Sequence, residues 1–335
     1  MSVHHVDRAL CGLDEQHAAM WLATVEDQPA ASTAMYLRSL RVPDRDEPLQ
    51  IGYWAHLFVL PEHRKLMLYP QLVFTMRKAM AELGIEAILT AMRRPEVTKG
   101  HLKLGFKVVC SWPVLVKPLK PFALLGKHKG IRLASAVAPI GDGLWRAGQS
   151  MLVRRGDPGL TVESFDAERV RGESRMLQEI CTLLADSAHD RAATIWKSNL
   201  LEARLGGGVD GEPYSVLMVR RDAKLEGVAI CRLATRGNDI RTGVILELAA
   251  DEENNSALRT LAIACERELA DRGAEAMLWL DGAGRQTSDM LRGIGYRTAA
   301  DETYRLIAFT QADAEPVLPS DADAWRFTFL DHDAF

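Results

Sequence analysis

The stretch from His56 to Phe106 constrains the fold of this chain more than any other. Its first residues are the end of the run LQIGYWAHLFVL, whose aromatic and branched residues are typical of a buried strand. A basic turn follows, and apolar residues then recur at the i, i+3, i+4, i+7 spacing of a helix with one buried face. IEAILTAM predicts a further strand, PEVTKGHLKL a short helix, and a Leu-Gly-Phe sequence closes the stretch.

The long helix is predicted over Tyr69–Leu83. Pro70 fits its first turn, where a missing N–H costs nothing. Gly84 fits the position just after its end, where the backbone often turns left-handed.

The same order of elements recurs from Val244 to Tyr296, about 190 residues later, which indicates a duplicated domain rather than stacked repeats. A length of 335 residues also suits two domains. We expect an N-terminal domain at residues 1–119, a partly helical connector at 120–149 and a C-terminal domain at 150–335. The expected fold class is α+β, with a mixed, largely antiparallel sheet and helices on both faces of each domain.

Two segments of the second half are informative. PYSVLMVRRDAKLEGVAICRLA predicts a hairpin, because two apolar strands flank a charged turn. The segment from Glu173 to Leu205 predicts helix with a break near Ser187–Asp190, and LGGGVDG after it predicts a flexible loop.

Charge and cysteine usage narrow the class of protein. A net charge of −4 gives no general attraction to nucleic acid or to an anionic membrane. No run of about 20 apolar residues is present for a membrane span, and the first residues hold no apolar signal sequence. The five scattered cysteines suit free thiols in a reducing cytoplasm better than disulfides or a zinc site, so we expect a cytoplasmic protein without a metal.

The turn in VLPEHRKLMLYPQL resembles the phosphate-binding pattern V-x-P-x-x-R-G-x-G-x-G-x-x-L of the GNAT acyltransferases, which hold acyl-CoA there. Val59, Pro61, Arg64 and Leu72 match the pattern, whereas Lys65, Met67 and Tyr69 stand at its three glycine positions. HLKLGF resembles the family's closing Y-E-K-L-G-F, with His101 at the tyrosine position.

The second half resembles tandem GNAT-like proteins that accompany bacterial polysaccharide biosynthesis. These carry a tryptophan before a tyrosine-led strand and end in W-x-x-T-x-x-D-x-D. Trp196, Tyr214, Gly227 and the run Trp325, Thr328, Asp331, Asp333 keep this pattern in part.

The resemblance implies that acetyl-CoA or another acyl-CoA binds at Val59, Arg64, Lys65, Leu66, Met67, Leu68 and Tyr69. Uncapped backbone N–H groups at a helix start attract a pyrophosphate, and Arg64 and Lys65 add positive charge. The bulky side chains at the glycine positions hinder close approach. An ordinary basic turn before a core helix is the alternative.

His56 and His101 are the candidate catalytic residues. An amine must lose a proton before it attacks a thioester, and the leaving thiolate takes one up. His56, in the strand beside the turn, is the candidate base, and His101 the candidate acid. For each, a structural histidine is the alternative.

The second half of the sequence has fewer candidate functional residues. Acidic residues precede its helix in LAADEENNSALRT and would repel a pyrophosphate, and Leu291 stands at the tyrosine position. Glu247 could act as a base, but an exposed carboxylate at a strand end is the preferred interpretation.

The expected function is acyl-CoA-dependent N-acyltransfer to a small amine, for which the resemblance suggests an amino sugar, in the first domain. The alternative is a non-catalytic tandem module that binds a metabolite or a partner protein. We expect no nucleic-acid partner, and a homo-oligomer is left open.

Overall fold

The computed structural model describes residues 2–6, 18–129, 137–145, 148, 157, 159–206, 212–251, 254–310 and 318–332. The chain forms two compact units. The first comprises residues 1–112, 190–195 and 303–326, and the second comprises residues 113–189, 196–302 and 327–335. Each unit is therefore assembled from three separate segments of the sequence. The domains predicted at residues 1–119 and 150–335 are continuous in sequence, unlike these two units. That division stays a prediction.

The first unit is built on a mixed sheet. Its strands follow the order β1 (Ser2–Val6), β2 (Ala18–Val25), β3 (Gln28–Arg41), β4 (Leu49–Val59), β5 (Ala87–Met92) and β13 (Arg297–Thr310). All neighbours pair antiparallel except β4 and β5, which are parallel. Strands β4 and β5 lie where LQIGYWAHLFVL and IEAILTAM predicted strands.

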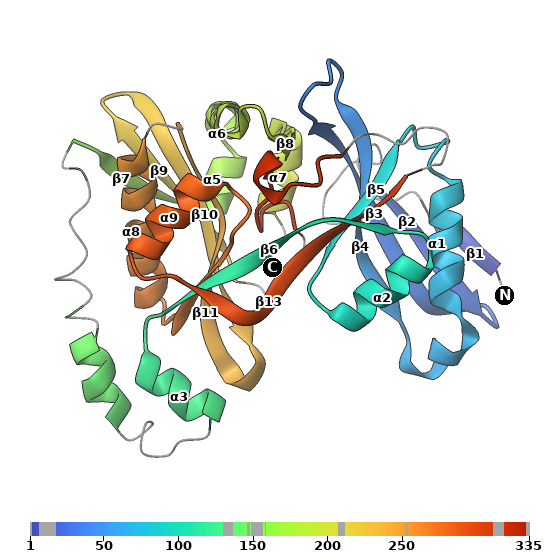
Figure 1. Ribbon diagram of the computed structural model, residues 1–335, viewed down its shortest axis with the longest axis horizontal. Coiled ribbons are helices and arrows are strands. Elements are labelled where there is room, and N and C mark those ends of the chain that lie inside the picture. The colour runs from blue at the N-terminus through green and yellow to red at the C-terminus, as the bar shows by residue number, and fades with distance from the viewer. Residues whose placement is uncertain are drawn as a thin grey trace. The chain divides into compact units, whose positions relative to one another are not determined.

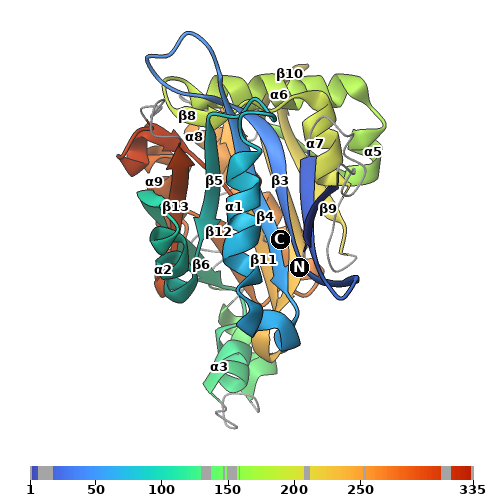
Figure 2. The same ribbon diagram turned by 90° about the vertical axis from the view of Figure 1, so that its right-hand side faces the viewer.

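Helix α1 (Leu68–Lys78) covers this sheet, and α2 (Pro95–Lys103) follows β5 (Figures 1 and 2). The predicted buried face of α1 is confirmed at Leu72, Val73 and Met76. The predicted end at Leu83 is wrong, because α1 ends at Lys78 and tighter turns continue to Gly84. Gly84 itself has the predicted left-handed backbone, with φ +65°.

The strands of the second unit also pair in both parallel and antiparallel directions. The strand order is β7 (Thr161–Asp166), β9 (Tyr214–Arg221), β10 (Lys224–Arg236), β11 (Ile240–Ala250), β12 (Ala276–Leu280) and then β6 (Lys107–Pro118). The predicted hairpin is confirmed as β9 and β10. Strand β6 starts in the first unit and pairs with β12 through its second half, Val114–Pro118.

Helices cover both faces of this second sheet (Figure 1). The helices are α5 (Ala167–Arg171), α6 (Ser174–Ala188), α7 (Ser198–Leu205), α8 (Asn255–Asp271) and α9 (Arg285–Gly293). Both α6 and α8 pack on β10 and β11. Residues 227–234 of β10 are all buried, as expected for a strand covered on both faces.

The break predicted near Ser187–Asp190 is confirmed, but it contains a strand that the sequence did not reveal. Strand β8 (Ala192–Thr194) pairs with the end of β3 and with β14 (Trp325–Arg326), all within the first unit. Three residues are too few to show the alternation that marks a strand. The predicted glycine-rich loop lies at 205–211, largely outside the described residues.

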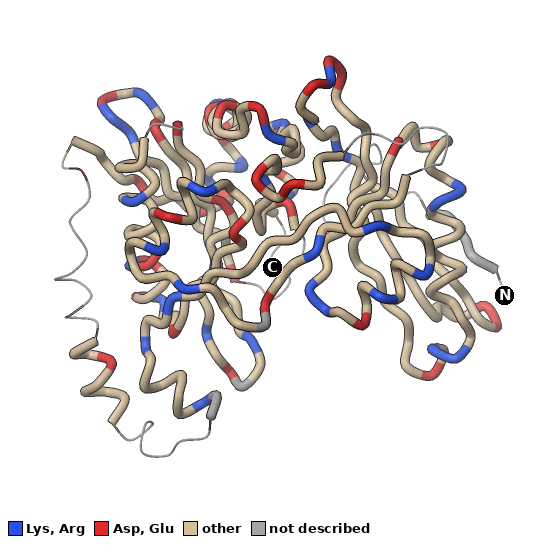
Figure 3. The backbone as a smooth tube through the Cα atoms, in the orientation of Figure 1, with Lys and Arg blue, Asp and Glu red and all other residues tan. Residues whose placement is uncertain are grey.

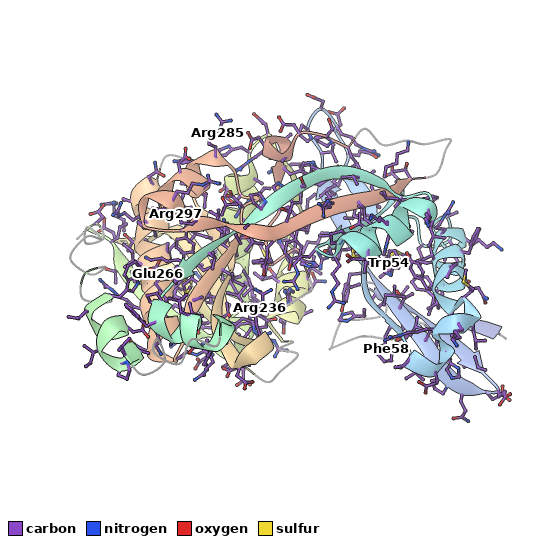
Figure 4. All side chains as sticks on the ribbon, turned by 60° about the horizontal axis from the view of Figure 1, so that its bottom comes forward. Trp54, Phe58, Arg236, Glu266, Arg285 and Arg297 are labelled. Atoms are coloured by element: carbon purple, nitrogen blue, oxygen red, sulfur yellow. The ribbon has the colours of Figure 1, made fainter. Side chains whose placement is uncertain are left out.

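A buried ion pair fixes β6 in the second unit. Lys117 Nζ on β6 lies 2.7 Å from a carboxylate oxygen of Glu266 on α8, and both side chains are almost fully buried. Figure 4 labels Glu266. Burial raises the pKa of Glu266, and the Lys117 ammonium opposes that rise. Removing either partner would leave a buried charge, so this pair specifies where β6 lies.

The connector is partly helical, as predicted. Helix α3 (Pro121–Lys129) follows β6, and residues 137–145 form a further helix.

Candidate functional site

In the first unit, β4 separates from β5 halfway along its length. The two strands pair at Ile51–Tyr53 of β4 and Ala87–Leu89 of β5. Beyond Tyr53, β4 runs on to Val59 with pairing to β3. The last six residues of β4 therefore leave the parallel pair just before the basic turn.

A β-bulge distorts this end of β4. Ala55 lies opposite Ala34 and Phe58 opposite Ser32, so His56 and Leu57 share one position on β3. His56 has a left-handed backbone, with φ +53°. Non-glycine residues adopt this conformation rarely, and bulges of this kind re-aim a side chain near functional sites.

The bulge turns His56 outward and against Tyr36. The His56 side chain is exposed, and its Nε2 atom lies 2.7 Å from the hydroxyl of Tyr36, which is buried on β3. The two rings meet edge to face at 5.8 Å. One ring nitrogen is thus engaged by a fixed partner, which orients the imidazole as a positioned base requires.

The basic turn is a 3₁₀ helix, η1 (Pro61–Leu66), that leads directly into α1. Met67 joins them in the left-handed conformation, with φ +55°, and its side chain is 64% exposed. The backbone therefore adopts, at the second glycine position of the pattern, the conformation that glycine adopts most readily. Met67 is the N-cap residue of α1, and its side chain forms no hydrogen bond with the first turn of that helix.

Basic residues lie on this same turn. Figure 3 colours Lys and Arg blue along the backbone. Arg64 and Lys65 are exposed in the last turn of η1, next to the start of α1. Leu66 is also exposed, whereas Leu68 is buried in the core, so Leu68 can offer a ligand its backbone and not its side chain. Exposed cations beside an uncapped helix start form a site suited to an anion.

His101 lies elsewhere, in the core of the first unit. Its side chain is fully buried on α2, with Nδ1 2.8 Å from the Val97 carbonyl oxygen and 3.1 Å from the Tyr69 hydroxyl. Since a carbonyl can only accept, Nδ1 carries the proton. The ring packs against Trp54 at a centroid distance of 4.5 Å. Burial lowers the pKa of His101, and the bond to Val97 only partly offsets this, so the imidazole is neutral at pH 7.

The predicted residues therefore separate into two groups. The structure brings Arg64, Lys65, Leu66 and Met67 together on the exposed turn that follows Val59 and the bulge at His56. His101 and Tyr69 belong to an aromatic cluster with Trp54 and Phe106, and burial raises the pKa of Tyr69. Tyr36 was missed by the sequence reasoning, because nothing in an alternating strand singles out one tyrosine.

Two parallel strands also separate in the second unit. There, a segment of the protein itself lies beside the strand that has lost its partner. Strand β11 pairs with β12 at Thr242–Ile245 and then continues past a bulge at Leu246. The Leu246 carbonyl accepts a hydrogen bond from Leu330 N at 2.9 Å, and the Gly282 carbonyl accepts one from Phe327 N at 2.8 Å. The C-terminal segment Phe327–Leu330 thus lies along β11 and is buried.

The prediction that Glu247 is an exposed strand-end carboxylate is wrong. Glu247 is 2% exposed, and its oxygens accept from the Leu248 N–H at 2.8 Å and the Thr328 hydroxyl at 3.1 Å. Thr328 also bonds to Asp331, which accepts from the Thr328 N–H at 2.8 Å. Glu247, which we expected to be exposed at a strand end, instead binds the C-terminal segment through Thr328.

Arg204 of α7 holds the same segment from another side. Its guanidinium donates to the carbonyls of Phe329, Leu330 and His332 at 3.1–3.4 Å. It also donates to the Tyr214 hydroxyl at 2.8 Å. At the start of α8, the Asn254 side chain accepts from Ala257 N at 3.0 Å, so this helix is capped where α1 is not.

The described residues also bear on membrane insertion and metal binding. No helix among them is both long and apolar enough to cross a membrane. Nor do they bring together three metal-binding side chains of the His, Cys, Asp and Glu types.

Solved structures share this fold, although no protein-family model and no curated protein matches the sequence. A GCN5-related N-acetyltransferase from Anabaena variabilis ATCC 29413 superposes with a TM-score of 0.57 at 10% identity, over 86% of this chain and 62% of that one. A conserved protein of unknown function from Enterococcus faecalis V583, described as a probable N-acyltransferase, gives 0.56 at 11% identity, over 88% and 62%. This chain thus spans less than two thirds of either.

The N-myristoyltransferase of Saccharomyces cerevisiae, solved with bound myristoyl-CoA, gives a TM-score of 0.61 at 13% identity, over 97% of this chain and 78% of that one. Identities this low establish a shared fold and nothing more specific. The predicted fold class, a mixed α+β fold of the GNAT type, is confirmed. The tandem order of two such domains stays a prediction, because segments of the two units alternate along the chain.

Proposed function

We propose that this chain transfers an acyl group from acyl-CoA to the nitrogen of a small amine, and that the first unit is the active one. The observation that carries the proposal is the uncapped start of α1. It directly follows η1, the exposed turn after the bulged end of β4 that bears Arg64 and Lys65. The pyrophosphate of CoA is an anion that such a helix start binds.

The contrast with the second unit supports this choice. There the position beside the separated strand is filled by Phe327–Leu330, and the helix start is capped by Asn254. A ligand would have to displace buried backbone hydrogen bonds to enter. We therefore propose that the second unit is structural or contributes to acceptor binding.

In the proposed reaction, His56 removes a proton from the ammonium form of the acceptor. The free amine then attacks the thioester carbonyl, the carbon–sulfur bond breaks, and CoA leaves as a thiolate. A thiol has a pKa of about 8.5, so the sulfur can leave as a thiolate. The nitrogen loses its second proton as the amide forms, and the thiolate takes up that proton through water. Tyr36 orients the His56 ring through the 2.7 Å contact.

His101 enters this proposal as a support and not as the acid. Its neutral, buried ring holds the Tyr69 hydroxyl at 3.1 Å, and Tyr69 lies in the first turn of α1. The predicted acid role stays open to test with His101→Phe.

The acceptor is proposed from the resemblance in the second half, which suggests an amino sugar and a place in polysaccharide biosynthesis. A cytoplasmic location is proposed as well. Burial raises the pKa of the Cys110 thiol to about 12 and that of Cys181 to about 11, as expected for unreactive thiols in a reducing compartment.

Thermal unfolding in the presence of acyl-CoAs from two to fourteen carbons tests the binding step. A ligand at 100 times its Kd stabilises by about 2.7 kcal/mol, which raises Tm by a few degrees. Arg64→Glu with Lys65→Glu should abolish the shift. Lys78→Glu is the matched control, because Lys78 is exposed at the far end of the same helix, about 15 Å away.

A non-catalytic binding module is the second candidate, and the side chains at the glycine positions favour it. Met67 in particular projects from the turn where a pyrophosphate would approach. Absence of a Tm shift with every acyl-CoA would support this function. A shift without thiol release in the presence of amino sugars and other amines would identify an acyl-CoA-binding protein that is not a transferase.

A further inference from the structure

The helix at residues 137–145 packs through its polar and small residues. The Asp142 carboxylate accepts hydrogen bonds from Phe122 N at 2.9 Å and Ala123 N at 3.2 Å, and so caps α3. A Cβ atom at Gly141 would lie 2.6 Å from the Phe122 ring, so only glycine allows this approach. Trp145 Nε1 donates to the Pro118 carbonyl at 3.3 Å. This helix is held beside α3, near the lower left of Figure 1.

Its large apolar residues face outward. Val137, Ile140 and Leu144 follow the i, i+3, i+7 spacing of one helix face, and Ile140 and Leu144 are 74% and 70% exposed. Trp145 and Leu125 of α3 are exposed as well. Of the twelve large apolar residues that are exposed among the described residues, these five fall within 21 positions of the chain. Scattered apolar residues need no explanation, but a cluster of this kind marks an interaction surface.

The charge of this region differs in sign from that of the whole protein. Residues 120–146 contain five Lys or Arg and one Asp, whereas the whole chain has a net charge of −4. The single acidic side chain, Asp142, is directed at α3. Lys127 is paired with Glu275 at 2.9 Å. Without this pair, the sequence of the segment still has a net charge of +3, which favours an anionic partner that the chain as a whole does not attract.

We propose that this face, formed by Leu125, Val137, Ile140, Leu144 and Trp145, docks on the surface of an anionic lipid bilayer. A helix with an exposed apolar stripe in a basic sequence lies in the plane of such a surface and buries the stripe among the lipids. A second copy of the chain is a poorer occupant, because a symmetric contact would bring together two segments whose sequences are both net basic. The inference does not depend on the proposed function.

Sedimentation with lipid vesicles tests the proposal directly. The full chain should sediment with vesicles that contain about half phosphatidylglycerol and not with pure phosphatidylcholine, and salt should weaken binding. Ile140→Ser with Leu144→Ser should lower the bound fraction at least about tenfold. The matched control is Val108→Ser with Val162→Ser, two apolar residues that are exposed on strands β6 and β7. It should bind as the unmodified chain does.

Three results would overturn the proposal. The first is no sedimentation with anionic vesicles at low salt. The second is binding that the Ile140 and Leu144 substitutions leave unchanged. The third is a dimer in lipid-free solution that the same substitutions dissociate, which would make this face an interface between copies. Thermal unfolding of each variant checks that the fold persists, as expected for exposed positions.

Discussion

The Tyr36 hydroxyl and His56 Nε2 lie 2.7 Å apart, where a bulge in β4 gives His56 a left-handed backbone. The strand would normally turn successive side chains to opposite faces. The bulge breaks that alternation, so an exposed imidazole meets a buried hydroxyl from the neighbouring strand. A residue held in a sparsely populated conformation suggests function, and this pair is the basis of the first prediction.

His56→Ala should lower acyl transfer more than tenfold without lowering Tm, because a positioned base contributes about 10²–10⁴ in rate and this side chain is exposed. Tyr36→Phe should have a smaller effect on rate and should shift the pH profile of kcat. Thiol release and thermal unfolding measure the two properties separately. Unchanged turnover in both variants would remove His56 from the mechanism.

Met67→Gly should stabilise the protein by about 0.5–1 kcal/mol, because glycine adopts a φ of +55° without the cost that a Cβ atom imposes. It should also tighten acyl-CoA binding, since the 64% exposed side chain no longer obstructs the turn. Urea unfolding and ligand titration measure these changes. Leu66→Gly is the control, and it should destabilise, since Leu66 does not have a positive φ.

His101 should make the protein sensitive to acid. Its pKa is lower in the folded chain than the value of about 6.5 expected when unfolded, so the unfolded chain binds the proton more strongly. Stability is therefore lost as the pH falls below about 6.5. His101→Phe should be less stable at pH 7.5, where Tyr69 loses its partner, but its Tm deficit should narrow toward pH 5. A deficit that stays constant between these pH values would show that His101 does not titrate in this way.

Thr328→Val should cost about 1–3 kcal/mol, because it leaves the buried Glu247 carboxylate and the Leu330 N–H without their hydroxyl partner. Thr182→Val is the matched control, since that hydroxyl bonds to a carbonyl on the exposed side of α6. Urea unfolding compares the two. Equal costs at both positions would mean that the C-terminal segment does not depend on this bond.

Lys117→Met should destabilise by about 3–5 kcal/mol, because it leaves Glu266 charged and buried. Adding Glu266→Leu should restore most of that loss, since a buried ion pair is often replaceable by apolar residues. A double variant that is no more stable than Lys117→Met would contradict this account of the pair.

The order of elements could be predicted because it depends on patterns that repeat along the chain. The buried face of α1 and the alternation in β9 and β10 each involve many residues. The end of α1 could not be predicted, because the apolar spacing continues to Leu83 while the backbone tightens after Lys78. Strand β8 was hidden because its pairing partners lie far away in sequence.

The site was predicted less completely than the fold. The exposed turn around Arg64 and Lys65 follows from a local motif. The burial of His101 depends on Trp54 and Phe106, and the role of Glu247 depends on a segment 81 residues further along. Contacts between distant segments leave no periodic signal, so a histidine in a core and a histidine in a site look alike in sequence.

The strand that completes the sheet of the first unit has a consequence for how the protein is made. Strand β13 pairs with β5 through residues 305–310, while residues 113–189 and 196–302 belong to the second unit. During synthesis, the ribosome must therefore finish nearly the whole chain before the edge of β5 is covered. An uncovered edge is a template for pairing with other chains. We therefore expect the nascent chain to expose this edge for longer than a chain of two consecutive domains would, and to aggregate more readily when translation is slow.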